Sequence, residues 1–174
     1  MAGEKVVFHV GVFGIPARIV NGEVKIKCNV RGDQAKQKEI AKVPQESTVL
    51  LVDCPGGAVK HGDASLDAAL AREIYEETDG CAIRSLGEFR RPLELMGDRS
   101  APYDLAFWKP VRLGGEPKPS KEATSHPWLS RQELAAADVY RAVSGLGLAG
   151  RTGKMMVAAL DFYEANKDKS ELFS

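Results

Sequence analysis

The chain has 174 residues, enough for one domain with a hydrophobic core and few for two, so we expect a single domain over residues 1–174. Lys plus Arg and Asp plus Glu both number 24, and this balance argues against a polynucleotide partner, whose binding needs a basic surface. No apolar run approaches the ~20 residues of a membrane span, and no signal peptide is recognisable. The three cysteines are widely spaced, with neither a zinc nor a disulfide pattern, which favours a reducing compartment, the cytoplasm.

The first part of the chain predicts a β-hairpin and a buried strand. Over residues 5–30, apolar side chains alternate on either side of Asn21-Gly22, a strong signal for a tight turn. Residues 31–46 are polar and predict a loop or a short helix. Residues 48–52 are apolar and β-branched, as in a buried strand, and a Pro-Gly-Gly turn at 55–57 follows them.

A change of period then predicts a helix over residues 67–78, which are rich in Ala, Leu, Arg and Glu and are followed by Asp79-Gly80. Further on, the pattern predicts two strands, a loop and a final amphipathic helix, at residues 81–89, 103–111, 114–124 and 153–165. Strands and helices alternate loosely, which is typical of a layered α/β domain with a mixed β-sheet.

The predicted helix at 67–78 carries a cluster of carboxylates. At ~100° per residue, Glu76 and Glu77 lie at about −60° and +40° from Glu73, so all three fit an arc of roughly 100°. Carboxylates this close repel one another unless a proton or a cation lies among them. A hard divalent cation, Mg²⁺ above all, prefers such oxygen ligands.

The surroundings of this cluster are consistent with a metal site. Leu70 and Ile74 form an apolar face that would anchor the helix to a sheet, and Arg72 stands one turn before Glu76 and can pair with it. In the turn before the helix, glycine has no side chain, so the backbone carbonyl of Gly56 can come close to a metal.

These residues resemble the Nudix box, G-x5-E-x7-R-E-U-x-E-E-x-G-U, where U is aliphatic. Gly57 matches the first glycine, and residues 72–77 (Arg-Glu-Ile-Tyr-Glu-Glu) match the central motif throughout. There are departures: Asp63 replaces the first glutamate, one extra residue precedes Arg72, and the final glycine comes one position late, as Gly80. The resemblance implies the family's α/β/α sandwich with a mixed β-sheet.

The resemblance also implies an activity: a pyrophosphohydrolase that cleaves a phosphoanhydride bond in a nucleoside diphosphate linked to another group, such as a nucleotide sugar or a nucleoside triphosphate. Glu73, Glu76, Glu77 and the carbonyl of Gly56 would bind Mg²⁺, with Mn²⁺ as an alternative. The general base of the family is a glutamate of the box or one of a later loop. Glu73 and Glu122 are the two candidates, and Glu122 is also a candidate metal ligand.

Two arginines that follow the box are candidates for binding a partner's phosphates. Arg90 and Arg91 follow the box and could grip phosphates, although surface ion pairing explains them equally well. The expected partner is a small nucleotide, with no membrane, and a homodimer is an open expectation because many relatives pair.

Two competing functions share the fold. A non-catalytic nucleotide-sensing module is disfavoured by the intact acidic triad. An isomerase of the isopentenyl-diphosphate type uses a Cys-x-His-Pro stretch before a degraded box. Here Ser125-His126-Pro127 follows an intact box and contains no cysteine.

Overall fold

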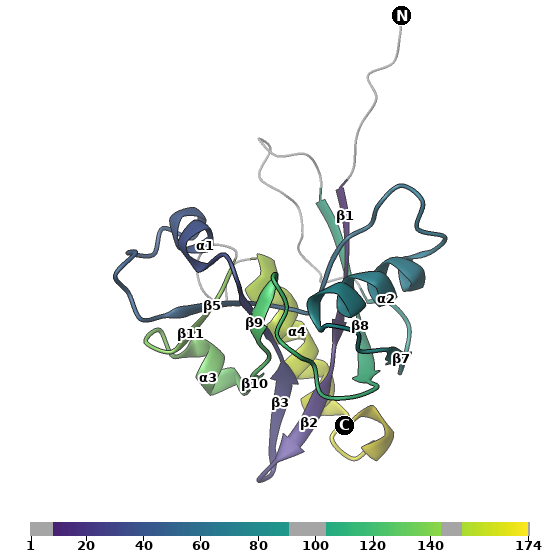
Figure 1. Cartoon of the computed structure of the whole chain (residues 1–174). Helices are drawn as coiled ribbons and strands as arrows, with labels where there is room; N and C mark the ends of the chain where they lie inside the picture. The colour runs from purple at the N-terminus through teal and green to yellow at the C-terminus, as the bar shows by residue number, and fades with distance from the viewer. Residues whose placement is uncertain (1–8, 91–103, 144–150, 174) are drawn as a thin grey trace, which may run out of the picture.

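The structure is a computed structural model that describes residues 9–90, 104–143 and 151–173 (Figure 1). The described helices are α1 (Gln34–Ile40), α2 (Leu66–Glu77), α3 (Arg131–Ala135), α4 (Arg151–Ala165) and the 3-10 helix η2 (Ser170–Leu172). The described strands are β1 (His9–Ile15), β2 (Ala17–Val20), β3 (Glu23–Lys27), β4 (Asn29–Arg31), β5 (Leu50–Asp53), β6 (Gly56–Ala58), β7 (Ile83–Ser85), β8 (Asp104–Leu113), β9 (Ala123–Ser125), β10 (Trp128–Leu129) and β11 (Tyr140–Ala142). None of these helices is long and apolar enough to cross a membrane.

The sheet on which helix α2 packs has the strand order β6-β1-β8-β7, and α2 carries the central motif of the box. Its central strand β1 runs parallel to β8 and antiparallel to β6, so the sheet is mixed. One face packs on α2, where Val12 and Val111 of the sheet meet Leu70 and Ile74 of the helix, all fully buried. This face sets the position of α2 and hence of its carboxylates.

The opposite face of the same sheet packs on α4. Ile15 and Trp108 belong to one buried cluster with Met156, Leu160 and Tyr163 of that helix. The sheet therefore lies between two helices, and the fold is the expected α/β/α sandwich with a mixed sheet (Figure 1).

Two further sheets complete the described structure, β10-β3-β2 and β11-β5-β4-β9. The hairpin expected at Asn21-Gly22 is confirmed, because β2 pairs antiparallel with β3 and both turn residues have positive φ, 51° and 79°. The expectation that residues 5–30 form one hairpin is wrong for residues 9–15, which form β1. β1 pairs instead with β6 and β8, and Pro16, which has no backbone N–H to donate, separates it from β2.

Helix α2 is confirmed, with each end one residue earlier than the expected 67–78. The hydroxyl of Ser65 caps the first turn by accepting from the backbone N–H of Ala68 at 3.1 Å. After the helix, Asp79 and Gly80 both adopt positive φ, 50° and 105°, and turn the chain away. The helix is thus fixed at both ends by local sequence.

Other boundaries differ from expectation in informative ways. Residues 31–46 contain the short helix α1, the second of the two alternatives, and the expected strand at 81–89 is reduced to β7. The strand expected at 103–111 is β8, and its first expected residue, Tyr103, lies outside the described residues. The final helix α4 is confirmed and starts two residues earlier than expected.

Candidate active site

The glycine turn, residues 55–57, brings backbone and side chain unusually close together. The sequence predicted a turn here, but both glycines belong to strand β6, because they pair with β1. Gly56 has a φ of 135°, and a Cβ there would lie 2.2 Å from the carbonyl oxygen of Val12. A Cβ on Gly57 would lie 2.4 Å from Oε2 of Glu73. At Gly56 a side chain would meet the backbone of β1, whereas at Gly57 the carboxylate of Glu73 would have to move aside. The two glycines therefore let bare backbone approach the carboxylates of α2.

Glu77 is the most deeply buried of the three carboxylates, with 2% of the residue exposed. Its Oε2 accepts two hydrogen bonds, from the backbone N–H of Gly56 at 2.7 Å and from Nδ2 of Asn29 at 2.9 Å. Burial raises the pKa of Glu77 to about 8, and the nearby charges of Asp53 and Glu73 act in the same direction. A cation beside this carboxylate would reverse the effect and favour its ionised form.

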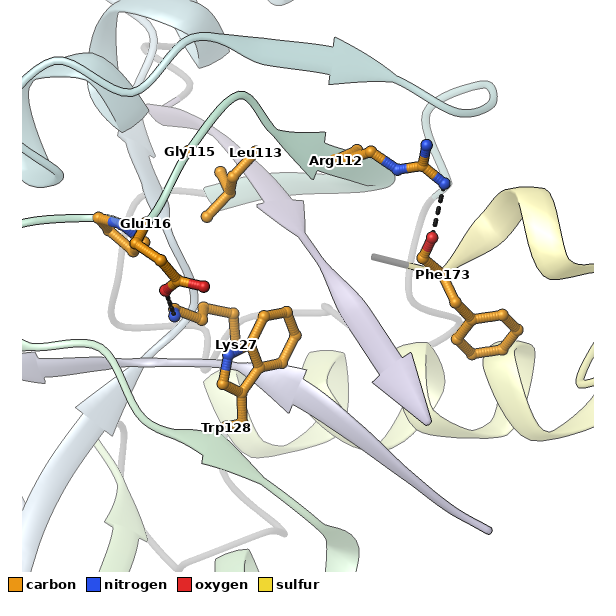
Figure 2. A pocket seen from close by; sticks show the side chains of 8 residues that line it. Lys27, Arg112, Leu113, Gly115, Glu116, Trp128 and Phe173 are labelled. Carbon is orange, nitrogen blue, oxygen red and sulfur yellow. Dashed lines mark hydrogen bonds and ion pairs between the residues drawn. The ribbon is translucent and has the colours of Figure 1, made fainter. Parts of the chain in front are cut away.

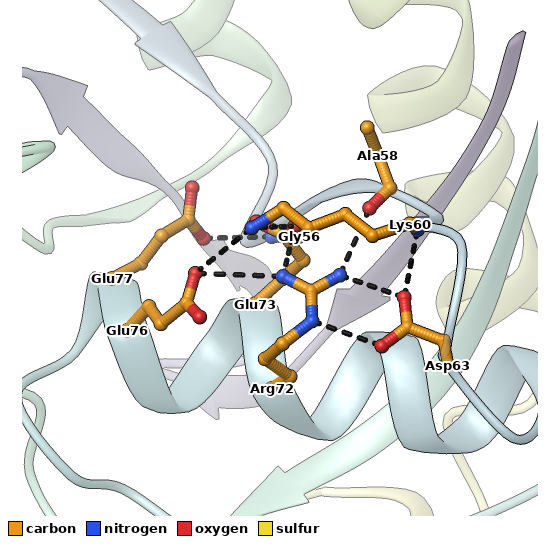
Figure 3. Close-up of polar contacts among 8 residues, drawn as sticks. All are labelled: Gly56, Ala58, Lys60, Asp63, Arg72, Glu73, Glu76 and Glu77. Atoms are coloured by element: carbon orange, nitrogen blue, oxygen red, sulfur yellow. Dashed lines mark hydrogen bonds and ion pairs between the residues drawn. The ribbon is translucent and has the colours of Figure 1, made fainter.

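Glu73 and Glu76 share two cationic partners (Figure 3). Nζ of Lys60 lies 3.6 Å from Oε1 of Glu73 and 3.5 Å from Oε2 of Glu76. Nη1 of Arg72 bonds Glu73 and lies 3.4 Å from Oε2 of Glu76. The expected Arg72–Glu76 pairing is therefore present.

Asp63 holds Arg72 from the other side. Nε and Nη2 of Arg72 donate to the two oxygens of Asp63 at 3.0 and 2.8 Å, and Nη2 also donates to the carbonyl of Ala58 at 3.0 Å. The second oxygen of Asp63 also accepts from the backbone N–H of Lys60 at 2.8 Å. These bonds from Arg72 lower the pKa of Asp63 to about 2. The sequence alone left the role of Asp63 open. The one sign that Asp63 has a role was its position, where the box has its first glutamate.

The three carboxylates are the type of ligand that a hard divalent cation prefers, but Glu73 and Glu76 are paired with Lys60 and Arg72. Glu73, Glu76 and Glu77 project from one side of α2 toward the glycine turn (Figure 3). Among the described residues, no group of three or more acidic, histidine or cysteine side chains stands close enough together to hold a metal. Lys60 and Arg72 would have to yield Glu73 and Glu76 for a cation to bind them together.

A cavity of about 300 Å³ opens beside the glycine turn. Its polar wall includes Arg31 and Asp53 together with Gly56 and Gly57. Its apolar wall includes side chains of β1, β8 and α4 and one residue just after β11, namely Phe13, Leu105, Ala106, Met155 and Val143. The sequence alone did not identify Arg31 and Asp53, because no motif marks them. Asp53 ends β5 just before the turn, and the pairing of β4 with β5 brings Arg31 to the same place.

The remaining predicted residues lie away from these contacts or outside the described part. Glu122 is exposed just before β9, where its carbonyl accepts from the backbone N–H of Gly32 at 2.9 Å. The guanidinium of Arg90 stacks 4.0 Å from the ring centre of Phe162 on α4. Arg91 lies outside the described residues. The roles of these three residues stay predictions.

A larger cavity of about 480 Å³ lies at the other end of β8 (Figure 2). Arg112 and Leu113 line it, whereas the first cavity is lined by Leu105 and Ala106. Seven strand residues at ~3.3 Å each separate the two by roughly 20 Å. In this cavity Nζ of Lys27 pairs with Oε2 of Glu116 at 3.0 Å. The smaller cavity is the candidate active site because it borders the glycine turn.

Comparison with known proteins supplies the family. A family model described as NUDIX domain matches residues 35–144, well over half of the chain. The chain therefore belongs to the Nudix family. Among curated proteins, none matches the sequence.

Solved structures agree in fold at low sequence identity. The MutT protein from Methanosarcina mazei Go1 is 17% identical with a TM-score of 0.54, and the match covers 93% of this chain and 99% of that one. An ADP-ribose pyrophosphatase from Streptococcus suis 89-1591 is 18% identical with a TM-score of 0.53, covering 88% and 90%. A UDP-X diphosphatase is 15% identical with a TM-score of 0.58, covering 95% and 67%. At these identities the likeness concerns the fold alone.

Proposed function

We propose that the protein is a Mg²⁺-dependent Nudix hydrolase that cleaves a phosphoanhydride bond in a nucleoside diphosphate linked to another group. The observation that carries the proposal is the arrangement of Glu73, Glu76 and Glu77 on one side of α2, against a glycine turn that borders a cavity. The same proposal treats the chain as one domain. A homodimer and a cytoplasmic location stay predictions.

The chain's own residues would prepare the site. Gly57 lets the backbone approach Glu73, and Asn29 and Gly56 fix one oxygen of Glu77. Asp63 holds Arg72 in place beside the acidic side chains. A divalent cation bound by Glu73, Glu76, Glu77 and the carbonyl of Gly56 would supply charge neutralisation for phosphate oxygens and make water more acidic.

The general base is one of two glutamates. Glu73 is nearly buried and paired with Arg72 and Lys60, whereas Glu122 is exposed on a loop. Replacing each by Gln and recording the pH dependence of kcat separates them. The variant without the base should lose the acidic limb of the profile, and the other should keep it.

The cavity supports a nucleotide substrate. A volume of about 300 Å³ is at the lower end of ligand pockets, which are mostly apolar with a few polar groups. Phe13, Leu105 and Met155 offer apolar contact to a base or sugar, and the guanidinium of Arg31 offers charge to a phosphate. The names of two structural neighbours, an ADP-ribose pyrophosphatase and a UDP-X diphosphatase, support a nucleoside diphosphate linked to a second group.

The test is hydrolysis of a panel of nucleoside diphosphate sugars, ADP-ribose and nucleoside triphosphates with Mg²⁺, read as release of nucleoside monophosphate or phosphate. We expect Glu76→Gln to abolish most of the activity on the preferred substrate without unfolding the protein, because Glu76 is the most exposed carboxylate of the three. Glu88→Gln, an exposed carboxylate outside the box, is the matched control. Binding of nucleotides without any turnover would favour the sensing module instead.

A further inference from the structure

A chain of hydrogen bonds runs from Glu77 away from the box. Asn29, at the start of β4, is 1% exposed, and its Nδ2 donates to Oε2 of Glu77 at 2.9 Å. The backbone N–H of Gly56 donates to the same oxygen. Both donors thus converge on Oε2, and within the described part of the chain no hydrogen bond falls on Oε1. The described residues therefore hold this carboxylate through one of its two oxygens.

His126, two residues before β10, holds Asn29 in turn. Its Nδ1 lies 2.7 Å from Oδ1 of Asn29. Because Nδ2 of Asn29 donates to Glu77, Oδ1 of Asn29 accepts, and Nδ1 of His126 carries the proton. The other ring nitrogen, Nε2, lies 3.0 Å from the carbonyl oxygen of Lys118. With the proton on Nδ1, Nε2 can donate to this oxygen only when the ring is doubly protonated.

Lys118 belongs to the loop that leads to Glu122. Its backbone N–H donates to the carbonyl of Thr78, the residue after Glu77, at 3.1 Å. The loop is also tied to β3 through the ion pair of Lys27 with Glu116. His126 therefore stands between a candidate metal-binding carboxylate and a loop fixed to the end of the same helix.

We propose that Asn29 and His126 are positioning residues of the metal site, which orient the carboxylate of Glu77 for a divalent cation. This inference rests on the proposed function. A carboxylate that binds a metal is itself commonly held by hydrogen bonds from a surrounding shell, and loss of such a partner typically weakens metal affinity by about 10–100-fold. The sequence gives no motif for this role, since Asn29 and Glu77 are 48 residues apart and Asn29 and His126 are 97 apart.

The test is the affinity of the full-length protein for Mn²⁺, measured by calorimetry or by electron paramagnetic resonance, without substrate. Two replacements of His126 separate its contacts. His126→Asn keeps a donor near the position of Nδ1 and so can still bond Asn29, whereas His126→Gln keeps one near Nε2 and can reach only Lys118. We expect His126→Gln and Asn29→Ala to weaken Mn²⁺ binding by about tenfold or more, and His126→Asn to stay near wild type. Ser125→Ala, an exposed neighbour, is the matched control.

Folding is checked by circular dichroism and thermal unfolding. If Asn29→Ala does not fold, the two variants of His126, which is only half-buried, decide whether the positioning role holds. If His126→Gln folds and binds Mn²⁺ as tightly as the wild type, the positioning role is overturned and the hydrolase proposal stands. The same holds if His126→Asn loses Mn²⁺ affinity while His126→Gln keeps it. A wild-type protein that binds no Mn²⁺ would overturn both.

Discussion

Individual residues at the candidate site show how tightly backbone and side chain are fitted. The two glycines of the turn face different neighbours, β1 at Gly56 and the carboxylate of Glu73 at Gly57. Asp63 grips Arg72 through both of its oxygens, so the arginine keeps a fixed place between Asp63 and Glu76. The consequences of these contacts can be tested one residue at a time.

Gly57→Ala should damage the site and spare the fold. The new Cβ would meet Oε2 of Glu73 at 2.4 Å, so the carboxylate must move away. A displacement of about 1 Å at a catalytic group can cost on the order of 10²-fold in rate, and we expect a loss in kcat of that order. Gly115→Ala, where a Cβ meets nothing within 4 Å, is the control and should leave kcat unchanged. Equal activity of the two variants would contradict this account of Gly57.

Asp63→Asn should change stability in a pH-dependent way. The pKa of Asp63 is lowered to about 2 in the folded protein by its bonds from Arg72, against about 3.9 for a free aspartate. A depressed folded pKa means that the pair stabilises the fold above the unfolded pKa and loses this effect as pH falls toward 2. Urea unfolding of the wild type and the variant at several pH values should show a difference at pH 7 that shrinks below about pH 4. A difference that grows on acidification would contradict the assigned pairing.

At the scale of elements, local sequence predicts some structure well and pairing poorly. Helix α2 was predictable because its composition, its Ser65 cap and the Asp79-Gly80 stop all lie within or beside it. The partners of β1 could not be predicted in this way, because they are β6 and β8, two strands that lie far along the chain. Likewise β6, a strand made largely of glycine, has no side-chain pattern to announce it.

The same division applies to the site. The box places its carboxylates on one helix, so Glu73, Glu76 and Glu77 could be predicted to share a side. Asn29 and Arg31 reach the site from β4, which carries no recognisable motif. Residues that act across such sequence distances become visible only after the strands are assembled.

Tyr163 links α4 to the central sheet and gives a stability test for the fold. Its hydroxyl, fully buried, donates to the carbonyl oxygen of Ile15 at 2.6 Å. Tyr163→Phe leaves that carbonyl without this partner, which typically costs about 1–3 kcal/mol. Urea unfolding should show this loss, whereas Tyr75→Phe, at an exposed position, should stay near wild type. Equal stability of both variants would mean that the bond is unimportant.

For the molecule as a whole, burial divides the cysteines into two kinds. Cys28 and Cys54 lie in the core between the sheets and α4, and burial raises the pKa of both thiols. Cys81 is only half-buried. A thiol-specific reagent at pH 8 should therefore modify Cys81 alone in the native protein and all three in urea. Rapid native labelling of Cys28 or Cys54 would contradict the packing described.

The central claim is that one turn of α2 holds a divalent ion against the glycine turn. Anomalous scattering from crystals grown with Mn²⁺ tests it most directly. We predict a peak bounded by Glu73, Glu76 and Glu77 and the carbonyl of Gly56, with Lys60 moved away from the carboxylates. Crystals with no peak there, and with Lys60 still paired to Glu73 and Glu76 at high Mn²⁺, would contradict it.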